Sequence, residues 1–94
     1  MSINSDHPKP IKIRFFARIR ERLNTSEIAW PTGNKGHVTV AMIRNELCSR
    51  GPEWLECFSG THQHCIAVNQ SVAREHTLVK PGDEVAFFPP VTGG

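Results

Sequence analysis

Hydrophobic and polar residues alternate over residues 11–16, which is the pattern of a strand with one buried face. A second strand is expected over residues 27–30, where it would form a hairpin with the first. A short helical turn is expected between them, over residues 18–23. Two further strands are predicted, over residues 64–68 and 84–88. In the first of them Ile66 and Val68 are expected to point inward.

Residues 39–50 are predicted to form the main helix, because Val40, Ile43 and Leu47 recur at helical spacing. Thr39 is expected to cap its start, and Gly51 to end it in a left-handed conformation. Pro52 suits the first turn of a second short helix. The apolar face of that helix is predicted to consist of Trp54, Leu55 and Phe58.

The order of these elements is a strand pair, one main helix and then further strands. It predicts an α+β domain with the helix packed on one face of a mixed sheet. Tight turns are expected at residues 69–71 and at the Pro-Gly-Asp sequence of residues 81–83. We expect residues 1–10 to be a flexible extension, 11–88 the folded domain, and 89–94 an extended tail.

Composition narrows the classes of function. Eleven basic residues are scattered among nine acidic ones in a chain of 94, so no nucleic-acid-binding face is expected. No run approaches the roughly 20 apolar residues of a membrane span, and the polar N-terminus lacks the apolar core of a signal peptide. We therefore expect a cytoplasmic protein whose three cysteines stay reduced and pack as small hydrophobic residues.

The C-terminal sequence is the strongest candidate for chemistry. Pro89 and Pro90 stop the last strand and favour an extended path, and Val91, Thr92, Gly93 and Gly94 follow them. Six extended residues reach roughly 20 Å, enough to enter a cleft on another protein. Gly94 ends in a carboxylate, a poor electrophile until an enzyme activates it, for example as an acyl-adenylate. A frayed terminus is the simpler interpretation, but the rigid proline spacer favours a functional tail.

Two Phe-Phe pairs give the candidate binding surface. Alternation places Ile11, Ile13, Phe15, Val85 and Phe87 on the inward face, and Phe16, Ala86 and Phe88 on the outward face. If the first and last strands are neighbours, Phe16 and Phe88 form one apolar patch, which Val72 would extend. Such patches often mark partner surfaces. The alternative is that the N-terminal extension covers them.

Other polar clusters are expected to be inert. His62, His64 and Cys65 lack the four convergent ligands of a structural zinc site, so we expect no metal and interpret them as surface histidines beside a packed cysteine. The arginines at positions 18, 20 and 22 are expected to form a solvated face, with an acidic partner as the alternative.

Several segments resemble the small sulfur-carrier subunits of molybdopterin synthase, in the ubiquitin-like MoaD/ThiS family. They are Phe15-Phe16-Ala17, Arg20-Glu21, Ala67-Val68-Asn69-Gln70 and, most specifically, Gly82-Asp83-Glu84-Val85-Ala86-Phe87-Phe88-Pro89-Pro90-Val91-Thr92-Gly93-Gly94. The resemblance covers about residues 11–94. It implies a β-grasp fold with the first and last strands side by side and parallel.

The resemblance also implies a function. Gly94 would be adenylated with ATP by a ubiquitin-activating-like adenylyltransferase and converted to a thiocarboxylate with sulfur from a cysteine-derived persulfide. The tail would then enter the synthase large subunit, in a two-plus-two complex, and deliver sulfur to the cyclic pyranopterin precursor to form the dithiolene of molybdopterin. The carrier would bind no cofactor and perform no catalysis by itself.

Three other functions stay open at this point. A related carrier would serve thiamin synthesis or tRNA thiolation, although the sequence Phe87-Phe88-Pro89-Pro90-Val91 resembles the molybdopterin branch more. A ubiquitin-like modifier would form isopeptide bonds through the same activated Gly94. A plain interaction module would make no chemical use of the tail.

Overall fold

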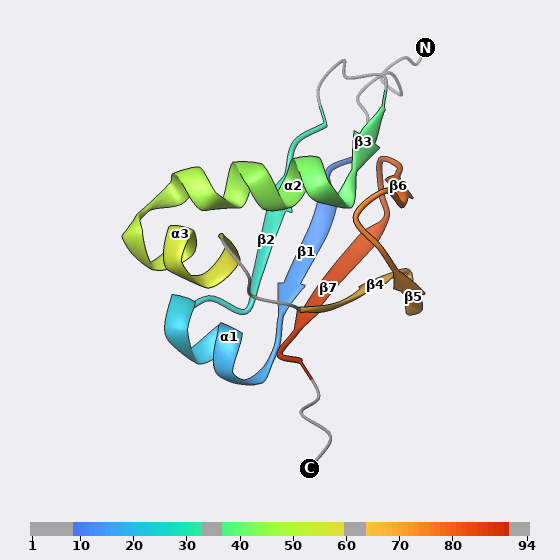
Figure 1. Cartoon of the computed structure of the whole chain (residues 1–94). Helices are drawn as coiled ribbons and strands as arrows, with labels where there is room; N and C mark the ends of the chain where they lie inside the picture. Colours follow the sequence, from blue (N-terminus) through green and yellow to red (C-terminus); the bar gives the residue numbers. More distant parts are fainter. Residues whose placement is uncertain (1–8, 33–36, 60–63, 91–94) are drawn as a thin grey trace.

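The computed structural model describes residues 9–32, 37–59 and 64–90, which build a five-stranded mixed sheet with helices on one side (Figure 1). The sheet has the order β2-β1-β7-β4-β5, and β3 and β6 form a separate pair. The strands are β1 (Ile11–Phe15), β2 (Glu27–Trp30), β3 (Val38–Thr39), β4 (Cys65–Val68), β5 (Ser71–Ala73), β6 (Leu78–Val79) and β7 (Glu84–Phe88). The helices are α1 (Ala17–Leu23), α2 (Val40–Leu47), the 3-10 turn η2 (Cys48–Arg50) and α3 (Pro52–Phe58). No helix in these described stretches is long and apolar enough to cross a membrane.

The first and last strands lie parallel at the centre of the sheet. Phe15 of β1 pairs with Phe87 of β7. β2 flanks β1 and β4 flanks β7, both antiparallel, so the predicted hairpin of β1 and β2 is confirmed. This is the α+β arrangement that the sequence pattern predicted and the ubiquitin-like β-grasp fold that the resemblance implied, with α2 lying across one face of the sheet (Figure 1).

The core lies between this sheet face and the helices. All five residues predicted to point inward are at most 1% exposed: Ile11, Ile13, Phe15, Val85 and Phe87. The rings of Phe15 and Phe87 stack at 6.2 Å between centroids, and Phe58 of α3 meets Phe87 edge-on at 5.2 Å. This aromatic contact joins the centre of the sheet to the helical layer.

The main helix is shorter than predicted. Thr39 caps it as expected, because its Oγ1 accepts a hydrogen bond from the amide of Met42 at 3.2 Å. Regular α2 ends at Leu47, and the chain continues through η2 to Gly51. Gly51 has φ 154° and ψ 173°, so the predicted left-handed helical conformation is wrong. The cause is Pro52, which disfavours helical conformations in the residue before it and occupies the first turn of α3.

The apolar face of α3 also differs from the prediction. Leu55 is 51% exposed, whereas Phe58 and Cys57 are buried and Trp54 is partly buried against the core. Positions 54, 57 and 58 follow the i, i+3, i+4 spacing of one helical face, and position 55 lies off it. The short sequence window did not distinguish these two sets.

Candidate functional site

The predicted tail begins directly after the last strand. β7 ends at Phe88, and Pro89 and Pro90 follow it without backbone N–H groups that could extend the sheet. Pro89 is half-buried and Pro90 is exposed. The predicted tail residues Val91, Thr92, Gly93 and Gly94 lie outside the described residues. The structure therefore fixes where the tail begins and which surfaces surround that point.

Phe16 and Phe88 form one stacked pair beside the start of the tail. Their ring centroids are 4.6 Å apart and the ring planes differ by 7°. Phe16 follows β1 and keeps an extended backbone (φ −125°, ψ 154°) before α1 begins. Its amide donates a hydrogen bond to the carbonyl of Phe87 at 3.2 Å, which continues the parallel pairing one residue beyond β1. Both rings are half-buried, so the pair presents a flat apolar surface.

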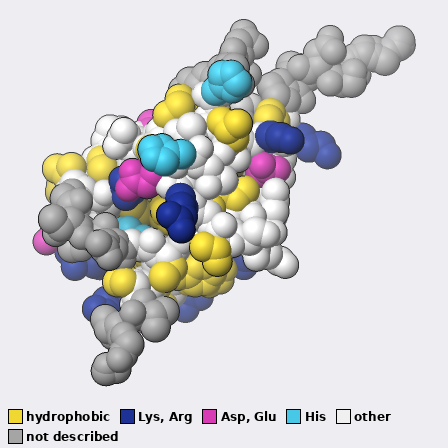
Figure 2. Space-filling view, turned by 45° about the vertical axis from the view of Figure 1, so that its right-hand side comes forward, with side chains coloured by type: hydrophobic (Ala, Val, Ile, Leu, Met, Phe, Trp, Pro, Cys, Tyr) yellow, Lys and Arg dark blue, Asp and Glu magenta, His cyan; other side chains and the backbone are white. Residues whose placement is uncertain are grey.

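The stack continues into the sheet face that the helices leave uncovered. Ala86 of β7 pairs with Ala67 of β4, and Ala67 pairs with Val72 of β5. Val72 is 93% exposed and shares the outward face with Phe88. We call this surface the open-face patch; its residues are Phe16, Ala67, Val72, Ala86 and Phe88, of which Ala86 is only 6% exposed and adds little accessible area. Hydrophobic side chains gather at the lower edge of the side shown in Figure 2, the end at which β7 finishes in Figure 1.

Charged side chains border the open-face patch along β1. The Arg14 guanidinium lies 5.2 Å from the centroid of the Phe16 ring. Its Nη1 is 3.6 Å from Glu84 Oε2, and its Nε is 3.9 Å from Glu27 Oε1. Exposed pairs of this kind contribute little stability. Their effect is to hold the guanidinium over one face of the Phe16 ring.

The histidine and cysteine assignments are reversed relative to the prediction. The His64 ring packs against Phe58 at 5.3 Å and Phe87 at 6.3 Å, whereas Cys65 is exposed beside Phe88 on the open face. Strand alternation explains this: the buried Ile66 fixes Cys65 outward and therefore His64 inward. His62 lies outside the described residues, and no cluster of three or more metal-binding side chains occurs within the described ones.

The arginines of α1 are not uniformly solvated. Arg22 Nη2 lies 2.6 Å from Glu56 Oε1 of α3, and its Nε lies 3.9 Å from Glu53. Between α1, α3 and the two prolines is a pocket that the sequence reasoning missed, lined by Arg18, Ile19, Arg22, Glu56, Cys57, His64, Pro89 and Pro90. The only sequence signal for it was the spacing of four between Arg18 and Arg22.

Comparison with known proteins agrees with this geometry. Residues 13–94 match the ThiS family. The molybdopterin synthase sulfur carrier subunit of Escherichia coli K12 is 39% identical over 87 residues, covering 89% of this chain and 99% of the relative. The corresponding Haemophilus influenzae protein is 33% identical over 84 residues, with the same coverage.

Solved structures share the fold. A putative molybdopterin converting factor, subunit 1, from Pyrococcus furiosus superposes with a TM-score of 0.71 at 26% identity, covering 88% of this chain and 99% of that one. A complex of subunits 1 and 2 of molybdopterin-converting factor from Helicobacter pylori contains a chain that superposes with a TM-score of 0.57 at 24% identity, covering 89% and 97%. At that identity, the second likeness is evidence of the fold alone.

Proposed function

Because the chain belongs to the ThiS family, we propose that it is the sulfur-carrier subunit of a molybdopterin synthase. The two bacterial relatives carry that name and align over nearly their whole length. The observation that carries the proposal is the flat, half-buried Phe16–Phe88 stack, which lies on the open sheet face at the point where Pro89 begins the tail. A protein that covers this stack is placed to receive the tail.

In this proposal the reactive group is the carboxylate of Gly94. A ubiquitin-activating-like adenylyltransferase transfers the AMP moiety of ATP to that carboxylate and releases pyrophosphate. The terminal sulfur of a cysteine persulfide then attacks the acyl carbon and displaces AMP, which gives an acyl disulfide. A thiol cleaves that S–S bond, so the thiocarboxylate is released and the thiol and the donor cysteine end as a disulfide. A carboxylate is ionised at neutral pH and unreactive toward nucleophiles, which is why the activation step is required.

After activation, the carrier binds the synthase large subunit through its open sheet face. The open-face patch docks, and the tail carries the thiocarboxylate into the large subunit, where its sulfur is delivered to the cyclic pyranopterin precursor. Acid and base groups for that reaction are supplied by the large subunit, and the carrier contributes the sulfur atom. The glycines at positions 93 and 94 suit a narrow channel because they have no side chains.

Intact mass spectrometry tests the proposal directly. The protein is isolated from cells that contain the activating enzyme, and its mass is compared with that of protein from cells lacking it. We expect a population in which sulfur replaces one terminal oxygen. A population consisting only of conjugates with other proteins would instead identify a ubiquitin-like modifier.

Deletion of Gly94 is the matching functional test. Since the deletion removes no residue of the described core or of the open-face patch, we expect an unchanged fold and unchanged large-subunit binding, but no sulfur transfer to the pyranopterin precursor. If the shortened chain still supports molybdopterin formation, the proposed role of Gly94 is wrong. Transfer to a thiamin or tRNA precursor, with none to the pyranopterin, would identify the related carriers.

A further inference from the structure

The pocket beside the start of the tail has a volume of about 190 Å³. One wall consists of Pro89 and Pro90, and the opposite walls belong to α1 and α3. Its inner surface includes Ile19, Cys57 and the ring of His64, which packs against the core aromatics. At about 30 Å³ per water molecule, this volume holds a carboxylate side chain together with a few waters.

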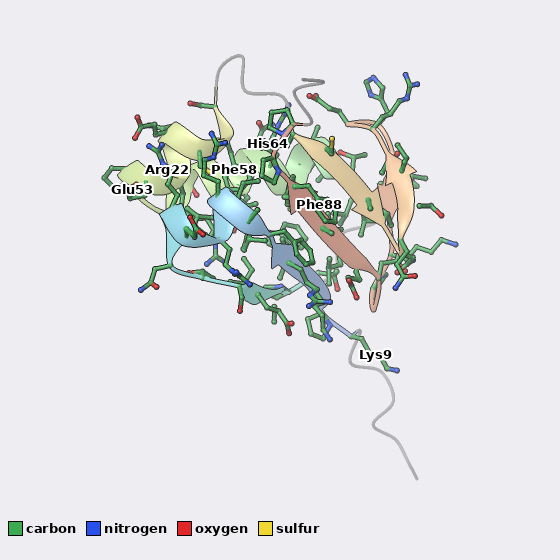
Figure 3. All side chains as sticks on the ribbon, turned by 90° about the horizontal axis from the view of Figure 1, so that it is seen from below. Lys9, Arg22, Glu53, Phe58, His64 and Phe88 are labelled. Atoms are coloured by element: carbon green, nitrogen blue, oxygen red, sulfur yellow. The ribbon has the colours of Figure 1, made fainter. Side chains whose placement is uncertain are left out.

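Arg22 lines the pocket and forms ion pairs with α3. It is paired with Glu56 and Glu53 of α3, so its charge is largely balanced within the chain. In Figure 3, Arg22 and Glu53 lie together at the junction of α1 and α3, on the same side of the sheet as Phe58 and His64. Burial raises the pKa of the Cys57 thiol, partly opposed by Arg22, so the thiol adds no charge at neutral pH.

Arg18 supplies a charge that this network leaves unbalanced. It precedes Arg22 by one helical turn, and both line the pocket. Over the described stretches of chain, no carboxylate lies within ion-pair distance of Arg18. Glu56 and Glu53 balance Arg22, so Arg18 is the lining charge that has no counter-ion among the described residues.

We propose that this pocket receives an aspartate or glutamate side chain of the synthase large subunit, with Arg18 as its counter-ion. This inference rests on the proposed function, since a partner must draw in residues 89–94. Two observations favour that occupant. One is the charge of the pocket. The other is its position: Phe16 immediately precedes α1 and Phe88 immediately precedes Pro89, so the open-face patch and the pocket adjoin the same two chain segments.

The test compares two charge reversals of equal size. Arg18→Glu reverses the charge at the pocket, and Lys80→Glu makes the same change after β6, at the end of the molecule away from the tail (Figure 1). Both side chains are exposed, so both variants are expected to fold, which circular dichroism checks. Dissociation constants are measured by calorimetry for the synthase large subunit and the activating enzyme separately, at low and at moderate salt.

We expect Arg18→Glu to weaken binding to the large subunit by about tenfold, with Lys80→Glu close to the unmodified protein. Arg18→Gln should make that affinity less dependent on salt. Reversing the matching acidic residue of the partner should restore binding to Arg18→Glu.

Equal binding of the two reversed variants to the large subunit would overturn the pocket assignment while leaving the proposed function intact. If neither partner binds the unmodified chain, the proposed function and this inference fail together.

Discussion

Phe87 and Phe88 are adjacent in sequence, yet their rings lie on opposite faces of the sheet. Phe87 is fully buried and its ring contacts Phe15, Phe58 and His64. Phe88 is half-buried and stacks on Phe16 alone among the described rings. Substituting each by alanine separates the cost of losing the core from the cost of losing the open-face patch.

The expected magnitudes differ clearly. A buried Phe→Ala change removes about 3–5 kcal/mol of unfolding free energy. A domain of 94 residues has about 5–14 kcal/mol in total, so Phe87→Ala is expected to leave a marginal fold. Phe88→Ala loses a stacking contact of about 0.5–1.5 kcal/mol and part of the burial of one ring, so we expect a cost of about 1–2 kcal/mol.

Binding should show the reverse order. An aromatic anchor at the centre of an interface is worth about 2 kcal/mol or more, so Phe88→Ala should weaken large-subunit binding about 30-fold. Phe87→Ala, corrected for its unfolded fraction, should change it far less. The measurements are urea denaturation followed by circular dichroism, and calorimetric titration with the large subunit. A larger stability cost for Phe88→Ala than for Phe87→Ala would show that the strand faces are assigned backwards.

Two further predictions follow from local features. Cys65 should be alkylated by iodoacetamide well before Cys57, since Cys65 is exposed and burial raises the pKa of the Cys57 thiol. Peptide mapping after timed labelling measures both rates, and equal rates would contradict the burial of Cys57. The same raised pKa lowers the unfolding free energy above about pH 8.5, where the Cys57 thiol ionises in the unfolded chain but not in the folded one. The unfolding free energy should therefore fall less between pH 7 and pH 10 in Cys57→Ala than in the unmodified protein, which denaturation at both pH values measures. Gln70 has φ 70° in the turn between β4 and β5, so Gln70→Gly should raise the unfolding free energy by about 0.5 kcal/mol, and a lower denaturation midpoint would refute the assigned strain.

Features with a short sequence period were predictable. The inward residues of β1 and β7 follow from two-residue alternation, because a strand directs successive side chains to opposite faces. The cap at Thr39 and the start of α3 at Pro52 follow from residues that satisfy or lack a single backbone group. The open-face orientation of Phe88 was predicted in the same way.

Features that depend on distant segments required the tertiary structure. The Phe16–Phe88 stack exists because β1 and β7, about 70 residues apart, pair in parallel with Phe15 opposite Phe87. The pocket exists because Arg22 of α1 meets Glu56 of α3 beside the prolines that follow β7. Gly51 was misassigned because Pro52 restricts the residue before it, and His64 and Cys65 because the inward Ile66 sets their faces. The face that α3 buries was decided by its packing against the core, which leaves Leu55 exposed. The sequence alone thus determined the main elements and the inward faces of β1 and β7, and the packing of distant strands and helices decided which outward residues meet at the start of the tail.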